Sequence, residues 1–116
     1  MKAYKRSTRV AQLIQEQVAK IFHDIKELNK GLVTVTQVKL TDDLQTCRIF
    51  YSVIGSEDDK KNAKTVLEEK LKFIRYQLAQ TVDLRRTPTI DFKYDDSSEK
   101  AAKVFEILEK IENEKK

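Results

Sequence analysis

The stretch VTVTQVKLTDDLQTCRIFYSVI, residues 33–54, decides the fold of this chain. Its first part, 33–40, is rich in the β-branched residues that favour strands, and its second part alternates apolar and polar residues. The residues predicted for the covered face of the second strand are Cys47, Ile49, Tyr51 and Val53. Because the connection at 41–43 is short, we expect an antiparallel hairpin. The apolar phase of the first strand shifts near 36–37, which predicts a β-bulge there.

A helical pattern precedes the hairpin. From Ser7, apolar residues recur at steps of three and four, which predicts an amphipathic helix. Ser7 or Thr8 can cap its start by accepting a backbone hydrogen bond. The helix is expected to end near 29–31, where Asn and Gly favour a left-handed residue. Its apolar stripe comprises Val10, Leu13, Ile14, Val18, Ile21, Phe22 and Ile25.

The segment after the hairpin predicts a second helical region. Ser56 can cap it, and the acidic residues 57–59 fall in its first turn, where negative charge complements the helix dipole. Helical spacing then continues to Val82, which is long for one straight helix in a small domain. We therefore expect two helices joined at a kink around Lys70–Lys72.

A third strand and a last helix complete the pattern. Pro88 cannot continue a helix, and residues 89–94 alternate as a strand. The predicted inner stripe of the last helix comprises Ala101, Val104, Phe105, Leu108 and Ile111. The predicted order is α-β-β-α-α-β plus a C-terminal helix. This order indicates an α+β fold with a three-stranded sheet, formed as one domain over 1–116 with flexible ends at 1–6 and 112–116.

Composition argues against several classes of function. The chain has 116 residues, a net charge of +4, one cysteine and one histidine. A single cysteine forms no internal disulfide, and the sequence contains neither metal-ligand spacing nor a Gly-rich phosphate loop. His23 and Cys47 have no catalytic partners at a recognisable spacing. We therefore expect a cytoplasmic monomer that is not an enzyme, needs no cofactor or metal, and has no membrane span.

Basic residues gather at places where a nucleic-acid backbone could make contact. The helical candidates, which share one face beside the predicted kink, are Lys61, Lys64, Lys72 and Arg75. The candidates outside these helices are Lys5, Arg6, Arg9, Arg48, Arg85 and Arg86. Phe50, beside Arg48 on the hairpin, could also stack on a base. Cations of this kind supply most sequence-independent affinity for nucleic acids, and the alternative is an ordinary solvated helix face.

Four stretches carry a family resemblance. They are Arg6-x-x-Arg9-Val10-Ala11-Gln12, then Asp43-Leu44 followed by Arg48-Ile49-Phe50-Tyr51, then Phe73-Ile74-Arg75, and finally Leu84-Arg85-x-x-Pro88-x-x-x-Phe92-x-Tyr94-Asp95-x-Ser97. In this order and at this spacing they resemble the ribosome-binding factor A family of bacterial small-subunit maturation factors. The fourth stretch is the most specific of the set.

The resemblance implies a type II KH-like fold and an RNA-facing function. It implies binding to the free small (30S) ribosomal subunit, contact with 16S rRNA, support for processing of its 5′ region, and a role in growth in the cold. Ordinary KH domains clamp nucleic acid with a GxxG loop, which this family replaces with an Ala-x-Gly kink. The corresponding residues here are Lys70-Leu71-Lys72, without a glycine. Lys70 and Lys72 could reach phosphates with their side chains instead.

The leading interpretation is therefore an assembly factor that binds small-subunit rRNA and has no active site. Two alternatives remain open from the sequence. One is a general RNA- or single-stranded-DNA-binding KH-like module. The other is a protein-binding adaptor that uses the exposed sheet face or the last helix.

Overall fold

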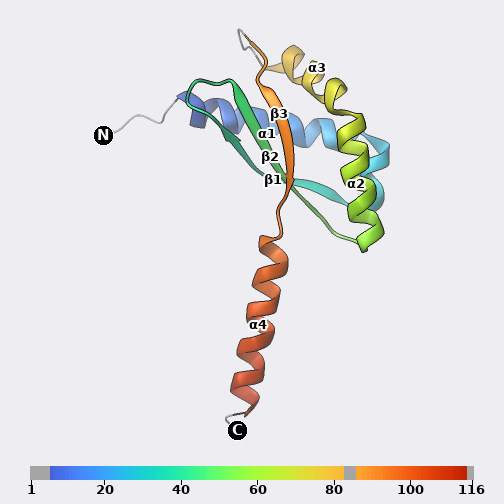
Figure 1. Cartoon of the computed structure of the whole chain (residues 1–116), viewed down its shortest axis with the longest axis vertical. Helices are drawn as coiled ribbons and strands as arrows, with labels where there is room; N and C mark the ends of the chain where they lie inside the picture. The colour runs from blue at the N-terminus through green and yellow to red at the C-terminus, as the bar shows by residue number, and fades with distance from the viewer. Residues whose placement is uncertain (1–5, 83–85, 115–116) are drawn as a thin grey trace, which may run out of the picture.

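The computed structural model describes residues 6–82 and 86–114, apart from the side chains of 29–31. Its elements are α1 (Arg6–Asp24), the 3₁₀ helix η1 (Lys26–Gly31), β1 (Val33–Leu40), β2 (Thr46–Val53), α2 (Glu57–Glu69), α3 (Leu71–Thr81), β3 (Thr89–Tyr94) and α4 (Ser97–Glu114). The predicted α+β order is confirmed, and η1 is an addition to it (Figure 1). Helix α4 continues into the segment 112–116 that we expected to be loose.

The sheet places β2 at its centre, in the order β1-β2-β3. Strand β2 pairs antiparallel with β1 and parallel with β3, so the three-stranded sheet is mixed. In the hairpin, Val33 lies opposite Val53 and Leu40 lies opposite Cys47. The register shifts between Val35 and Gln37, so the predicted bulge is confirmed. The bulge restores the inward phase for the second half of β1.

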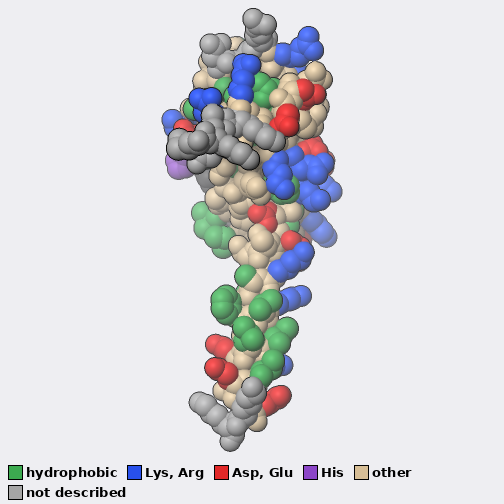
Figure 2. All heavy atoms as spheres, turned by 90° about the vertical axis from the view of Figure 1, so that its left-hand side faces the viewer, with side chains coloured by type: hydrophobic (Ala, Val, Ile, Leu, Met, Phe, Trp, Pro, Cys, Tyr) green, Lys and Arg blue, Asp and Glu red, His purple; other side chains and the backbone are tan. Residues whose placement is uncertain are grey.

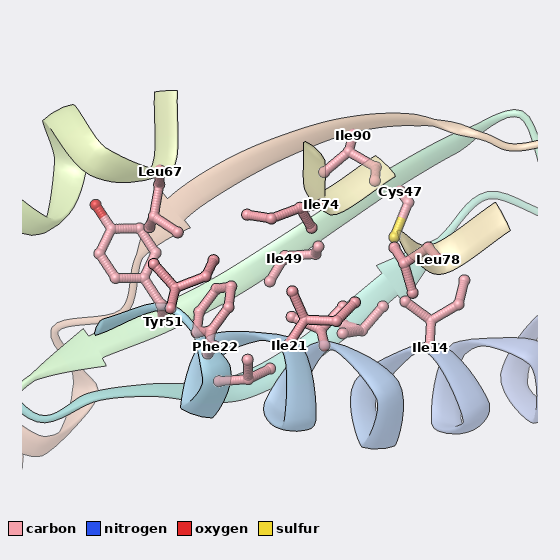
Figure 3. Packing of buried hydrophobic residues seen from close by; sticks show 14 of the residues in the cluster. Ile14, Ile21, Phe22, Cys47, Ile49, Tyr51, Leu67, Ile74, Leu78 and Ile90 are labelled. Atoms are coloured by element: carbon pink, nitrogen blue, oxygen red, sulfur yellow. The ribbon is translucent and has the colours of Figure 1, made fainter. Parts of the chain in front are cut away.

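The hydrophobic core lies between one face of the sheet and the helices that cover it. Figure 3 shows Ile14 of α1, Ile49 of β2 and Ile74 of α3 converging in this layer. All three side chains are fully buried. The predicted covered face of β2 is likewise buried, and Cys47 lies within it. Burial, with a smaller effect from the charge of Asp91, raises the pKa of the Cys47 thiol to about 12.

The bend between α2 and α3 occurs at one residue, Lys70. Its backbone has φ −93° and ψ 5°, a region that any L-residue can adopt. The Lys70 N–H donates to the Val66 carbonyl at 2.8 Å, and the Lys70 carbonyl accepts from Ile74 N–H at 2.8 Å. Lys70 therefore keeps both of its backbone hydrogen bonds at the bend, and the bend needs no glycine. The predicted kink is confirmed, and the missing glycine does not prevent it.

The start of α2 follows its predicted chemistry closely. The Ser56 hydroxyl accepts from Asp59 N–H at 3.2 Å, and the Asp59 carboxylate accepts from Ser56 N–H at 2.8 Å. These two bonds form a capping box, which satisfies two donors that the helix leaves free. A Cβ at Gly55 would collide with the Asp59 side chain, so this close approach favours glycine.

Three details of the first helical region differ from the expectation. Helix α1 begins at Arg6, so Ser7 lies inside its first turn, where its buried hydroxyl donates to Asp42 at 3.2 Å. Leu13 is exposed and does not belong to the inner stripe. The left-handed residue at the exit is Leu32, with φ 49°, because η1 continues the chain to Gly31. Leu28 of η1 is fully buried and continues the apolar spacing by three residues beyond Ile25, where the predicted stripe ended.

Helix α4 overturns the prediction of an inner stripe. Every described side chain of α4 is exposed, including Phe105 at 67% and Leu108 at 52%. The helix leaves the end of β3 and projects away from the rest of the domain (Figure 1). The radius of gyration is accordingly 17.3 Å, against about 13 Å for a compact chain of this length. An amphipathic period predicts a helix but does not say what covers its apolar side.

The root of α4 is tied to the body by a polar cluster. Lys60 of α2 contacts Glu99 at 2.6 Å, and the Tyr94 hydroxyl donates to Glu99 at 2.5 Å. The Lys60 ammonium also lies 5.3 Å from the centre of the Tyr94 ring. The hydrogen bond from Lys60, followed by that from Tyr94, lowers the pKa of Glu99. Asp95 accepts from Ser97 and, at 2.6 Å, from Thr36, and these bonds lower its pKa to about 2.

Candidate RNA interface

The predicted cations on the helix pair lie on its solvent side. Inward-facing Ala63, Val66 and Leu67 fix the orientation of α2, so helical spacing turns Lys61 and Lys64 outward. Lys72 is exposed at the start of α3. Within the described residues, none of these three lysines forms an ion pair. We call Lys61, Lys64 and Lys72 the helix-pair lysines. Their charge is available to a phosphate backbone.

The kink adds an aromatic neighbour to these cations. The half-buried Lys70 places its ammonium 5.9 Å from the centre of the Phe73 ring, and Phe73 is 47% exposed. This geometry matches a cation–π contact. Lys70 therefore lies at the bend with its ammonium close to a ring, and its RNA contact stays a prediction.

Arg75 joins α3 to the connector that precedes β3. Its guanidinium donates to the Thr87 carbonyl at 2.9 Å and to the Pro88 carbonyl at 3.1 Å. Two of the five N–H donors of the guanidinium are used in this way. The sequence predicted an RNA contact at Arg75 and did not reveal this brace. The RNA contact stays a prediction for the remaining donors.

Arg48 lies apart from the helix pair. It projects from the sheet face opposite the core, next to half-buried Phe50, and it pairs with Asp91 at 3.1 Å. Arg48 and Asp91 are direct neighbours in the β2–β3 register. The pair neutralises Arg48 locally, and both side chains are about half-exposed. The structure therefore does not bring Arg48 together with the helix-pair lysines.

The remaining predicted contacts cluster at one end of the sheet. Arg6 and Arg9 are exposed on the first turns of α1, and Arg86 is exposed on the connector. The hairpin turn links both segments, since Ser7 bonds to Asp42 and Thr89 N–H donates to the Gln45 carbonyl at 2.8 Å. Lys5 and Arg85 lie outside the described residues. Figure 2 shows Lys and Arg side chains gathered on the body, above an arm with hydrophobic side chains.

A groove of about 440 Å³ runs between α2–α3 and the edge strand β3. The residues lining it are Tyr51, Lys64, Leu67, Glu68, Leu71 and Ile90 to Tyr94. The lining includes two carboxylates, of Glu68 and Asp91, and two ammonium groups, of Lys64 and Lys93, so the groove is not a purely cationic channel. Burial, and then the charge of Glu68, raises the pKa of Tyr51 at its base. Helical and strand periods alone do not reveal this groove, because it forms between elements distant in sequence.

The candidate catalytic groups do not assemble into a site. His23 is exposed at the end of α1, and Cys47 is buried with a raised pKa, which keeps its thiol protonated. Among the described residues, no cluster of three or more His, Cys, Asp or Glu side chains could hold a metal ion. Within the same residues, no helix combines the length and the apolar character needed to cross a membrane.

The fold and this surface define a class, the small KH-like α+β domains that carry exposed lysines along a kinked helix pair. The family model for ribosome-binding factor A matches residues 6–108 of the chain. The chain belongs to the ribosome-binding factor A family, whose members are non-catalytic ribosome assembly factors. The family resemblance predicted from the four sequence stretches is thus confirmed.

Relatives match the chain over nearly its whole length. Ribosome-binding factor A of Trichlorobacter lovleyi is 38% identical and covers 93% of this chain and 89% of the relative. That of Carboxydothermus hydrogenoformans is 43% identical, with 91% and 86% covered. The crystal structure of ribosome-binding factor A from Thermus thermophilus has a TM-score of 0.65 at 20% identity, covering 76% of this chain and 93% of the other. A Thermus thermophilus homology model fitted into a cryo-EM map of a 30S–RbfA complex has a TM-score of 0.68 at 21% identity, covering 80% and 98%.

Proposed function

We propose that this chain binds the free small (30S) ribosomal subunit in the cytoplasm and assists maturation of its 16S rRNA, including the 5′ region. The observation that carries the proposal is the row of exposed helix-pair lysines, unpaired within the described residues, in a chain of this family. A structural relative is a ribosome-binding factor A model placed in a 30S complex, which supports the choice of partner.

The proposed mechanism is electrostatic docking followed by release. The helix-pair lysines contact successive phosphates, and Arg6 and Arg9 at the start of α1 and Arg86 on the connector before β3 extend the contact. Binding holds an immature rRNA conformation until the site is remodelled. Because each phosphate contact releases condensed counterions, the affinity falls steeply as salt rises.

Sedimentation of cell extract tests this proposal. On a sucrose gradient, the full chain is expected to travel with free small subunits and to be scarce among translating ribosomes. Its depletion is expected to accumulate 16S rRNA with an unprocessed 5′ end. A uniform distribution that follows bulk RNA would favour the general nucleic-acid-binding alternative and contradict the ribosomal one.

The exposed arm favours a second function, that of a protein-binding adaptor. Helix α4 carries five glutamates and three lysines, so RNA phosphates would repel much of it. Its apolar side chains Val104, Phe105, Ile107, Leu108 and Ile111 are all more than 40% exposed. We infer that this stripe docks in an apolar groove of a protein whose rim is basic.

A variant with two substitutions tests the arm. Phe105→Ser with Leu108→Ser is expected to abolish the part of subunit binding that resists nuclease and high salt. Its thermal unfolding should be unchanged, because neither side chain is buried. The corresponding control, Ile54→Ser, removes an equally exposed apolar side chain from the body. Unchanged binding by the α4 variant, or self-association of the chain through α4, would contradict the proposed partner.

A further inference from the structure

Helix α3 presents an aromatic ring at the centre of its solvent side. Its buried residues are Ile74 and Leu78, and Tyr76 lies midway between them in sequence. At 3.6 residues per turn, this position faces the opposite side of the helix. Tyr76 is accordingly 61% exposed. An aromatic ring here contributes little to the core, so its position calls for another explanation.

A hollow lies directly beside this ring. It has a volume of about 330 Å³ and is lined by Lys72, Arg75, Tyr76, Ala79 and Thr87. The small side chain of Ala79 leaves the space open. Arg75 forms a fixed wall, because its guanidinium is held by the carbonyls of Thr87 and Pro88. The hollow thus combines the flat ring of Tyr76, the guanidinium of Arg75 held by two carbonyls, and Lys72, which forms no ion pair among the described residues.

We propose that this hollow binds one unpaired RNA base, stacked on the Tyr76 ring beside Arg75, with an adjacent phosphate at Lys72. The source of that RNA rests on the proposed ribosomal function. Base stacking on an aromatic ring tolerates every base but requires that the base be unpaired. Phosphate contacts, in contrast, form with paired and unpaired RNA alike. The hollow would therefore direct the domain to rRNA segments that have not yet formed their final helices.

The neighbouring aromatic is a poorer platform. Phe73 is less exposed than Tyr76, and the Lys70 ammonium already lies over its ring. Among the described residues of the body, 6–82 and 86–96, the large exposed apolar side chains are Leu13, Leu32, Ile54, Phe73 and Tyr76. The two aromatics of this set both lie on α3 beside the predicted RNA-contacting cations, as stacking sites in single-strand-binding proteins do.

Binding of a short single-stranded RNA that contains 2-aminopurine tests the site on the full chain. The wild-type protein is expected to quench the fluorophore on binding. Tyr76→Leu is expected to remove the quenching and to weaken binding about 10- to 100-fold, since one stacked base contributes that much. Tyr76→Phe is expected to keep both the quenching and the affinity of the wild-type protein. The dependence of affinity on salt should stay the same in Tyr76→Leu, because no cation is lost.

Two controls separate stacking from other causes. Ile54→Ala truncates a similarly exposed apolar side chain outside the hollow and should leave binding unchanged. The same RNA paired into a duplex should bind Tyr76→Leu as well as it binds wild type. Quenching that persists in Tyr76→Leu, or an equal loss in Tyr76→Phe, overturns the proposal. Sedimentation with small subunits is scored separately, so a failed stacking site and a failed ribosomal function give different results.

Discussion

Reversing the helix-pair lysines, with Lys61→Glu, Lys64→Glu and Lys72→Glu combined, is expected to weaken binding to free small subunits at least about 100-fold. Each exposed lysine–phosphate contact contributes on the order of 1 kcal/mol, and three contacts are lost. The slope of log affinity against log salt should also fall by about two to three. Filter binding of purified subunits over a salt series measures both quantities.

Helix α4 offers a control with the same change in net charge. Lys100, Lys103 and Lys110 are all exposed, and reversing them changes the charge equally on the arm. This control should keep most of its affinity for rRNA. If both triple variants lost affinity to the same extent, the effect would reflect net charge alone, and the helix pair would lose its assignment. Unchanged thermal unfolding of both variants verifies that the fold is intact.

Ile49→Ala is expected to lower the free energy of unfolding by about 3 kcal/mol. Ile49 is fully buried at the centre of β2, with Val38 and Phe92 as its neighbours on the flanking strands. Truncation removes buried apolar surface and leaves a cavity that the packed layer cannot fill. Because small domains have only about 5–15 kcal/mol of stability, the loss is a large share of the total.

Urea denaturation followed by circular dichroism measures this change. The midpoint should fall while the slope of free energy against urea stays constant. Ile54→Ala is a matched control, because this side chain is 69% exposed and its truncation should change stability by less than about 0.5 kcal/mol. Equal losses at the two positions would contradict the placement of the core on this face of β2.

Local patterns predicted most of the fold. The alternation after Cys47, the phase shift near 36–37 and the capping residues at Ser56 each have a short-range cause, and each prediction is confirmed. The kink at Lys70 was also predicted, because continuous helical spacing was too long for one straight helix in this domain. In these cases the residues that determine the structure lie within a few positions of one another.

Tertiary contacts account for what the sequence did not reveal. The neutralisation of Arg48 depends on its register with Asp91, and the brace at Arg75 depends on where the connector passes. The exposure of α4 follows from the path that the chain takes after β3, which no helical period encodes. Helical spacing does not reveal a site at Tyr76 for the same reason, since the hollow beside it requires Thr87 from another segment.

The anchored root of α4 turns the helix into a strut of fixed span. Its 18 residues rise about 27 Å from the end of the sheet. The two proposed contacts, one on the helix pair and one at the far end of the strut, would then act together as a bivalent ligand, because the first contact would raise the effective concentration of the second. Because the strut is stiff, both contacts can form at once only on a partner whose two sites are separated by its length. Removing one helical turn would shorten the span by about 5 Å and uncouple the two contacts.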